Sequence, residues 1–209
     1  MENSATGLPH LNALEVRVLG SLMEKQLLTP DTYPLSLNAL QSAANQKTSR
    51  EPVMALEPVD ISRTLKSLEE RGLTKRMMAS RVDRYEQTAS RHFSLTTQQS
   101  ALMAMLLLRG PQTLNELLTR TDRMANFSSA DAVREELDML IGKRPALVKE
   151  IGRAPGQRED RFAQLLAGDV DVATAATSVP RESISDLKAR IAALEAEVAE
   201  LRARLGDSA

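Results

Sequence analysis

Side chains that could carry covalent or acid–base catalysis are scarce in this sequence of 209 residues. It contains no Cys and only two His, His10 and His92, which excludes thiolate zinc sites, iron–sulfur clusters and cysteine nucleophiles. The segment Gly152–Gly156 (GRAPG) lacks the Lys–Ser/Thr ending of a phosphate-binding P-loop. We therefore expect a protein that is not an enzyme and that holds no metal and no cofactor.

The placement of the basic residues is more informative. Lys and Arg total 27 against 28 Asp and Glu, yet the stretch from Arg71 to His92 holds six basic residues and two acidic ones. A local excess of cations attracts the phosphates of nucleic acids. The residues that we expect near phosphate are Lys47, Arg50, Arg63, Lys66, Arg76, Arg81 and Arg84.

The elements that must position these residues occur twice in the same order, as three helices and two β-capable runs. The first set is a helix over Leu11–Leu28, a helix capped by Ser36, a helix from Pro58 that Gly72 ends, and β-capable runs at Leu73–Ala79 and Tyr85–Leu95. The second set is a helix over Thr97–Leu108, helices capped by Thr113 and Ser129 with a stop near Gly142, and β-capable runs at Ala146–Ile151 and Arg161–Leu166.

A short sequence repeat accompanies this order. Ser36–Leu40 (SLNAL) is echoed by Thr113–Leu117 (TLNEL) at the same place in the two sets. We interpret the echo as duplication of one module. A single all-α domain is the alternative, and the two β-capable runs in each set argue against it.

Three helices followed by a hairpin are typical of the winged helix-turn-helix. We therefore predict a mainly α (α+β) fold of two tandem winged helix-turn-helix domains followed by a C-terminal coiled-coil helix. The expected boundaries are a disordered start at 1–10, domains at 11–94 and 95–166, a flexible linker at 167–182 and the coiled-coil helix at 183–206.

Apolar residues in the last segment recur at alternating spacings of three and four, which is the pattern of a coiled-coil seam. β-Branched residues at one seam position and Leu at the other favour a parallel pair of helices, so we expect a homodimer. A helix that folds back on its own domains is the alternative. The predicted dimerisation residues are Ile184, Leu187, Ile191, Leu194, Val198, Leu201 and Leu205.

A winged helix-turn-helix suggests double-stranded DNA as the partner, because its third helix fits the major groove. The acidic residues of the two third helices weaken this expectation. Glu57 and Asp60 open the first one, where acidic side chains also favour the helix dipole. The second exposes Asp131, Glu135, Glu136 and Asp138 against Arg134. We therefore expect the first domain to contact DNA, and the second to bind a protein partner or its own copy.

Four segments closely resemble the YceH family of bacterial proteins. They are Thr29–Leu40 (TPDTYPLSLNAL), Asn45–Met54 (NQKTSREPVM), Leu106–Thr113 (LLLRGPQT) and Pro155–Phe162 (PGQREDRF). The resemblance spans about Leu11 to Phe162 and includes the C-terminal coiled coil. It implies a pair of winged helices and carries no functional residues, because no biochemical activity is established for the family. For Asn45–Met54 two interpretations stay open: it braces the turn between two helices, or it contacts a partner.

The sequence favours a DNA-binding protein, expected to be a dimeric transcription regulator that uses its first domain. The alternative is an interaction module without enzymatic activity whose winged helices dock protein partners, and a regulator with a small ligand between its domains is a weaker third hypothesis. The longest apolar run, Ala101–Leu108, is far shorter than the roughly 20 residues of a membrane span. Met1–Gly7 has neither the basic residues nor the apolar stretch of a signal peptide. We therefore expect a cytoplasmic protein with no membrane partner.

Overall fold

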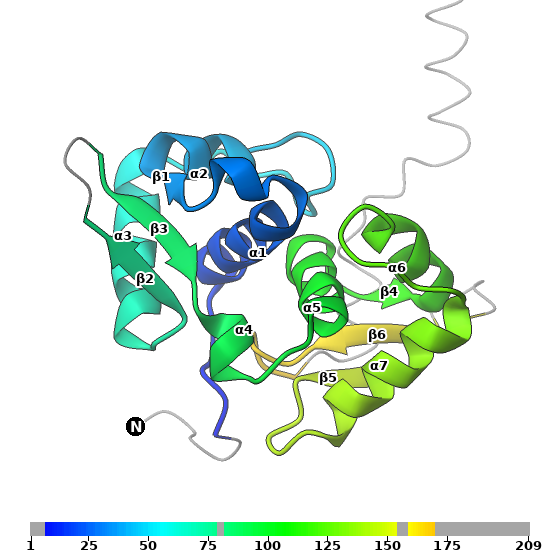
Figure 1. Cartoon of the computed structure of the whole chain (residues 1–209). Coiled ribbons are helices and arrows are strands. Elements are labelled where there is room, and N and C mark those ends of the chain that lie inside the picture. Colours follow the sequence, from blue (N-terminus) through cyan, green and yellow to red (C-terminus); the bar gives the residue numbers. More distant parts are fainter. Residues whose placement is uncertain (1–6, 79–81, 154–158, 170–209) are drawn as a thin grey trace, which may run out of the picture. The chain divides into compact units, whose positions relative to one another are not determined.

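The computed structural model of the chain describes residues 7–78, 82–153 and 159–169 (Figure 1), which belong to one compact unit. It is a mixed α+β structure in which two halves repeat one order of helices and antiparallel strands. The predicted dimerisation residues and the predicted linker from residue 170 onward lie outside the described residues, as does Arg81.

The first half contains three longer helices and a three-stranded sheet of order β1-β3-β2. Asn12 caps its first helix and forms a capping box with Glu15. Pro58 occupies the first turn of α3, and Gly72, with φ of 72°, follows its end. The elements are α1 (Ala13–Leu28), the 3-10 turn η1 (Pro30–Thr32), β1 (Leu35–Ser36), α2 (Leu37–Ala44), α3 (Pro58–Glu70), β2 (Thr74–Met77), β3 (Arg84–Gln87) and α4 (Ala89–His92).

The second half has the same sheet order, β4-β6-β5. Its helices are capped as expected, because the side chains of Thr113 and Ser129 accept hydrogen bonds from the backbone N–H groups of Glu116 and Ala132. The elements are α5 (Thr97–Arg109), β4 (Gln112–Thr113), α6 (Leu114–Thr121), α7 (Ala130–Gly142), β5 (Val148–Ile151) and β6 (Arg161–Gln164).

The two halves repeat individual contacts as well as element order. Leu35 of β1 pairs with Tyr85 of β3, and Gln112 of β4 pairs with Phe162 of β6. In both sheets an arginine at the start of the middle strand donates to a proline carbonyl that precedes the short first strand. These pairs are Arg84 with Pro34, at 2.8 Å, and Arg161 with Pro111. Repetition of such specific contacts supports duplication of one module.

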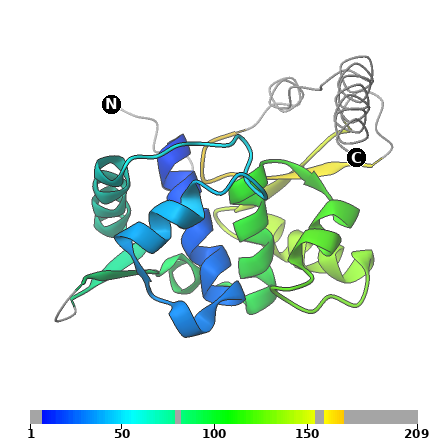
Figure 2. The ribbon, with the colours of Figure 1, turned by 90° about the horizontal axis from the view of Figure 1, so that it is seen from above.

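Helices α1 and α5 meet at the centre of the described unit (Figures 1 and 2). Gly20 allows this close approach: a Cβ at that position would lie 3.0 Å from the Cβ of Leu107 and 3.0 Å from the Cγ of Leu108. Both helices are buried along most of their length, and one apolar core runs through both halves. The hydrophobic effect therefore stabilises the two halves together.

Two features differ from the sequence prediction. The run expected over Tyr85–Leu95 is a strand only to Gln87 and then becomes the short helix α4. The physical reason is local: the side-chain Oε1 of Gln87 accepts from the backbone N–H of Ser90 at 2.9 Å, which turns the chain out of the strand. The two-residue strands β1 and β4 were not expected either, because a run this short has no period that a sequence can show.

Residues 7–10, which we expected in a disordered start, are among the described ones. Leu11 donates its backbone N–H to the carbonyl oxygen of Leu166 at 2.7 Å, and the backbone carbonyl oxygen of His10 accepts from the guanidinium of Arg71 at 2.9 Å. These contacts join His10 and Leu11 to both halves.

Candidate nucleic-acid interface

A groove of about 490 Å³ lies between α3 and the ribbon of β2 and β3. It brings together three of the predicted phosphate contacts, Arg63 and Lys66 from α3 and Arg76 from β2. Ser62, Tyr85 and the acidic Glu69 complete its polar lining, and none of these three residues was predicted as a site residue. We call this the first-half groove.

The spacing of the buried residues along α3 explains which of its side chains reach the groove. Ile61, Thr64, Leu65 and Leu68 are buried on the core side. Ser62, Arg63, Lys66 and Glu69 are exposed on the outer side. The ribbon is fixed to the helix by two hydrogen bonds. The hydroxyl of Thr74 donates to the carbonyl of Leu65 at 3.2 Å, and the backbone N–H of Arg76 donates to a carboxylate oxygen of Glu69 at 3.0 Å.

Carboxylates lie close to two of the three cations. Arg63, whose side chain is 78% exposed, is 3.7 Å from Asp60. Arg76 pairs with Asp83, and the hydrogen bond to that carboxylate raises the pKa of Arg76. Lys66 is exposed and makes no hydrogen bond or ion pair with any residue that the structure describes. The groove is therefore basic but partly neutralised at its rim.

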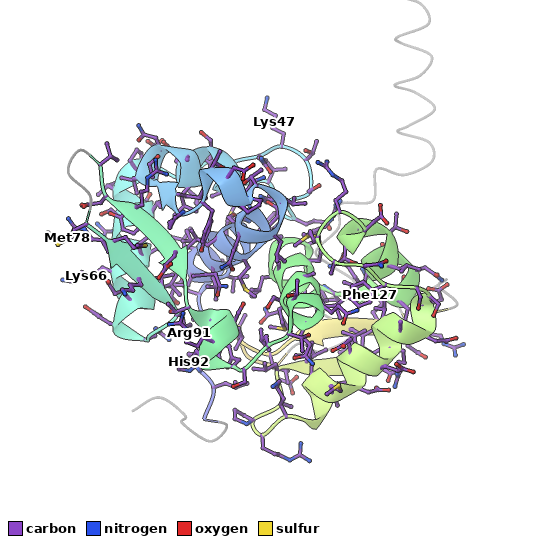
Figure 3. The ribbon with its side chains drawn as sticks, viewed as in Figure 1. Lys47, Lys66, Met78, Arg91, His92 and Phe127 are labelled. Carbon is purple, nitrogen blue, oxygen red and sulfur yellow. The ribbon has the colours of Figure 1, made fainter. Side chains whose placement is uncertain are left out.

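The other predicted contacts do not line this groove. Lys47 lies on the connection between α2 and α3, well separated from Lys66 in Figure 3. Arg84 is exposed at the start of β3, where it donates to the carbonyl of Pro34. Arg81 lies outside the described residues. The predicted set thus contains one group of three and separate single residues.

The expectation that Arg50 lies near phosphate needs correction. Its side chain has no exposed surface, and its guanidinium donates to the two carboxylate oxygens of Glu24 at 3.0 and 2.6 Å. It also donates to the carbonyl oxygen of Ala43 at 3.0 Å. A phosphate at the surface therefore has no access to Arg50, whose role is internal.

A second buried arginine supports the same connection. Arg17 of α1 donates to the carbonyl oxygens of Ala44 and Pro52, which lie on either side of the polar segment 45–51. Burial, and then the nearby charge of Arg50, lowers the pKa of Arg17 to about 10, so the group keeps its charge at pH 7. Arg17 and Glu24 could not be predicted as buried charges from the sequence, because charged residues on a helix are usually exposed.

Asn45 completes the bracing of this connection. Its side chain accepts from the backbone N–H of Leu56 at 2.8 Å and donates to the carbonyl of the same residue at 3.0 Å. The interpretation of Asn45–Met54 as a brace is therefore confirmed for these contacts, while Lys47 and Thr48 stay exposed at its tip.

The corresponding place in the second half carries an ion pair. Arg134 of α7 lies 2.9 Å from Glu150 of β5 and 2.9 Å from Asp138, and its guanidinium carbon is 5.2 Å from the ring centroid of Phe162. Hydrogen bonds that Arg134 donates to Glu150 and then to Asp138 raise the pKa of Arg134. Arg134 thus joins α7 to β5 through its ion pair with Glu150.

Glu136, which we expected on the exposed face of α7, accepts from the side-chain amide of Gln99 of α5 at 2.8 Å instead. The exposed acidic residues of α7 are therefore Asp131, Glu135 and Asp138.

Within residues 7–78, 82–153 and 159–169, no group of three or more His, Asp or Glu side chains is arranged to hold a metal ion. In the same ranges no helix is both long and apolar enough to span a membrane.

Residues 11–157 match the family model described as "Protein of unknown function, DUF480". The chain is 62% identical over 200 residues to the UPF0502 protein mll4256 of Mesorhizobium japonicum, which covers 95% of this chain and 96% of the relative. It is 48% identical over 206 residues to a UPF0502 protein of Stenotrophomonas maltophilia, covering 96% and 94% of the two chains. The match to the family model and these near full-length identities show that the chain belongs to the DUF480 (UPF0502) family of bacterial proteins.

Proposed function

We propose that the protein binds double-stranded DNA through the first-half groove, with each half acting as a winged helix-turn-helix. In this proposal α3 enters the major groove, and the ribbon of β2 and β3 follows the phosphate backbone. Arg63, Lys66, Arg76 and Arg84 supply the described cations for phosphate, and Ser62 offers a hydroxyl toward base edges.

The observation that carries the proposal is the difference in charge between two equivalent helices. The buried residues Ile61, Leu65 and Leu68 of α3 have the same spacing as Val133, Leu137 and Leu140 of α7. When the two helices are aligned on these residues, Arg63 corresponds to Glu135 and Lys66 corresponds to Asp138. These two exposed positions are therefore basic in the first half and acidic in the second, although α3 also exposes Glu69 and Glu70 at its end. A polyanion is attracted by the first pattern and repelled by the second.

The predicted pairing of the C-terminal helices extends the proposal to a dimeric transcription regulator. A dimer places two first-half grooves on one duplex, which matches the two-fold symmetry of many operators. The predicted seam residues between Ile184 and Leu205 supply this pairing.

The proposal is tested by fluorescence anisotropy of a labelled duplex titrated with the full chain at several salt concentrations. About four phosphate contacts give a log–log slope near −3.6, which corresponds to roughly 150-fold weaker binding at 200 mM than at 50 mM salt. The double substitution R63A/K66A should weaken binding to all sequences, whereas R123A, at an exposed position between α6 and α7, should not. No binding at 50 mM salt, or equal loss in both variants, would contradict the proposal.

A second candidate function, docking of a protein partner, is favoured by the exposed apolar side chains around α3 and the ribbon. These are Val59, Met77, Met78 and Val82, each between 42% and 86% exposed. Exposed apolar surface of this kind marks protein interaction sites when it is contiguous. If this function holds, M78S should reduce capture of a partner from nuclease-treated lysate and leave duplex binding unchanged; unchanged capture would argue against it.

A further inference from the structure

We propose that the protein associates with a second copy of itself head to tail, with α7 of one copy lying on α3 in the first-half groove of the next. This contact uses the same groove as the proposed DNA contact, so duplex DNA should compete with it. The exposed faces of the two equivalent helices carry opposite charges at matching positions. On α3 these are Arg63 and Lys66, with Glu69 and Glu70 exposed nearer its end. On α7 they are Glu135 and Asp138, of which Asp138 also pairs with Arg134.

The spacing of these charges is the same on both helices, because each pair is separated by three residues. If the helices pack antiparallel, Arg63 meets Asp138 and Lys66 meets Glu135 of the other copy. If they pack parallel, Arg63 meets Glu135 and Lys66 meets Asp138. Opposite charges meet in both orientations, so the complementarity does not depend on the crossing direction.

Apolar side chains accompany the charges on both surfaces. Val59 lines the first-half groove and is 61% exposed, while Met139 stands beside Asp138 on α7 and is 60% exposed. An apolar contact between two such side chains removes surface from water and adds a salt-independent term to the charge attraction. Lys66 has no competing partner among the described residues, so it is free for a carboxylate of another copy.

The exposed charges of α3 and α7 cannot pair with each other within one chain. They lie on opposite sides of the described unit in both Figure 1 and Figure 2, with the core helices α1 and α5 between them. The partner of each face must therefore come from another molecule. Faces on opposite sides give a heterologous contact, which propagates from copy to copy instead of closing by reciprocal exchange.

Cross-linking tests the contact directly, because the chain has no natural cysteine. A full-length S62C chain is mixed with a full-length M139C chain of different mass, and a short bismaleimide is added. We expect a mixed covalent dimer at 50 mM salt and at least about a fivefold lower yield at 500 mM, since salt screens exposed charges. A matched control pairs M139C with S42C, an exposed position on α2, and should give little product.

Charge exchange separates this contact from pairing through the C-terminal helix. Adding R63E and K66E to the S62C chain should lower the yield, and adding E135K and D138K to the M139C chain as well should restore it in either helix orientation. Restoration also shows that both variants are folded. The proposal is overturned if neither salt nor the charge substitutions change the yield, or if the yield equals that of the S42C control. Either outcome counts whether or not the protein binds duplex DNA.

Discussion

Arg50 and Glu24 form a buried ion pair, with guanidinium–carboxylate distances of 3.0 and 2.6 Å and almost no exposed surface on either side chain. The pair joins α1 to the connection between α2 and α3. The pair therefore helps to fix the position of the polar segment 45–51, which leads from α2 toward α3. The same carboxylate lies 3.2 Å from the Nζ of Lys25, so Glu24 pairs with two neighbouring cations.

Glu24→Gln should destabilise the protein by about 3 kcal/mol, because it leaves Arg50 buried without its counter-charge. The free energy of unfolding in urea measures this. Glu57→Gln, at an exposed site, should change it by less than about 0.5 kcal/mol. Equal effects of the two substitutions would show that the buried pair contributes nothing beyond a surface charge.

Tyr33→Phe should alter how stability depends on pH. Burial is the main cause that raises the pKa of the Tyr33 phenol above its ordinary value, so folding favours its neutral form. The unfolded phenol ionises near pH 10, and the wild type should therefore lose stability as the pH rises above that value. The Tyr33→Phe protein should not show this loss of stability at high pH, because it has no phenol at position 33.

At pH 7 the same substitution should cost about 1 kcal/mol, because the hydroxyl accepts from the backbone N–H of Gln87 at 2.5 Å. Urea unfolding of both proteins between pH 8 and pH 11 measures the difference. Parallel curves over that range would contradict the assignment to Tyr33.

Gly20→Ala should destabilise the protein by about 1–3 kcal/mol, because the added methyl group meets Leu107 and Leu108 where α1 packs on α5. Gly142→Ala is the matched control. Nothing lies within 4 Å of a Cβ at the end of α7, so this change should be neutral or slightly stabilising. The midpoint of urea unfolding gives both values, and similar midpoints for the two variants would argue against the close packing.

Arg134→Ala should lower stability by about 1 kcal/mol, because Arg134 pairs with Glu150 of the ribbon and lies over the ring of Phe162. Lys66→Ala on the equivalent helix of the first half should be nearly neutral, because Lys66 is exposed and has no described partner. If Lys66→Ala proves the more destabilising, Lys66 has a structural role and the first-half groove loses its principal free cation.

The helices were largely predictable from the sequence. Apolar spacing and capping residues predicted α2 and α7 within about one residue, and the break at Gly110 predicted the end of α5. The hairpins after Gly72 and Gly142 were also predicted as pairs of β-capable runs, and both are antiparallel. Their boundaries were less predictable, because the end of β3 depends on the side chain of Gln87.

The candidate site was predictable only in part. Arg63, Lys66 and Arg76 meet in one groove, as an exposed helix face beside a basic hairpin suggests. Arg50 could not be placed correctly, since its partner Glu24 is 26 residues away and their contact depends on tertiary packing. Local charge patterns identify basic segments, whereas burial decides which cations remain at the surface.

Amide hydrogen exchange of the full chain with and without a duplex at 50 mM salt tests the central claim most directly. DNA should slow exchange in residues 59–66 of α3 and 74–77 of β2, and should not slow it in residues 130–142 of α7 or 148–151 of β5. Protection of the second-half segments alone, or no protection in either half while the duplex is bound, would contradict it.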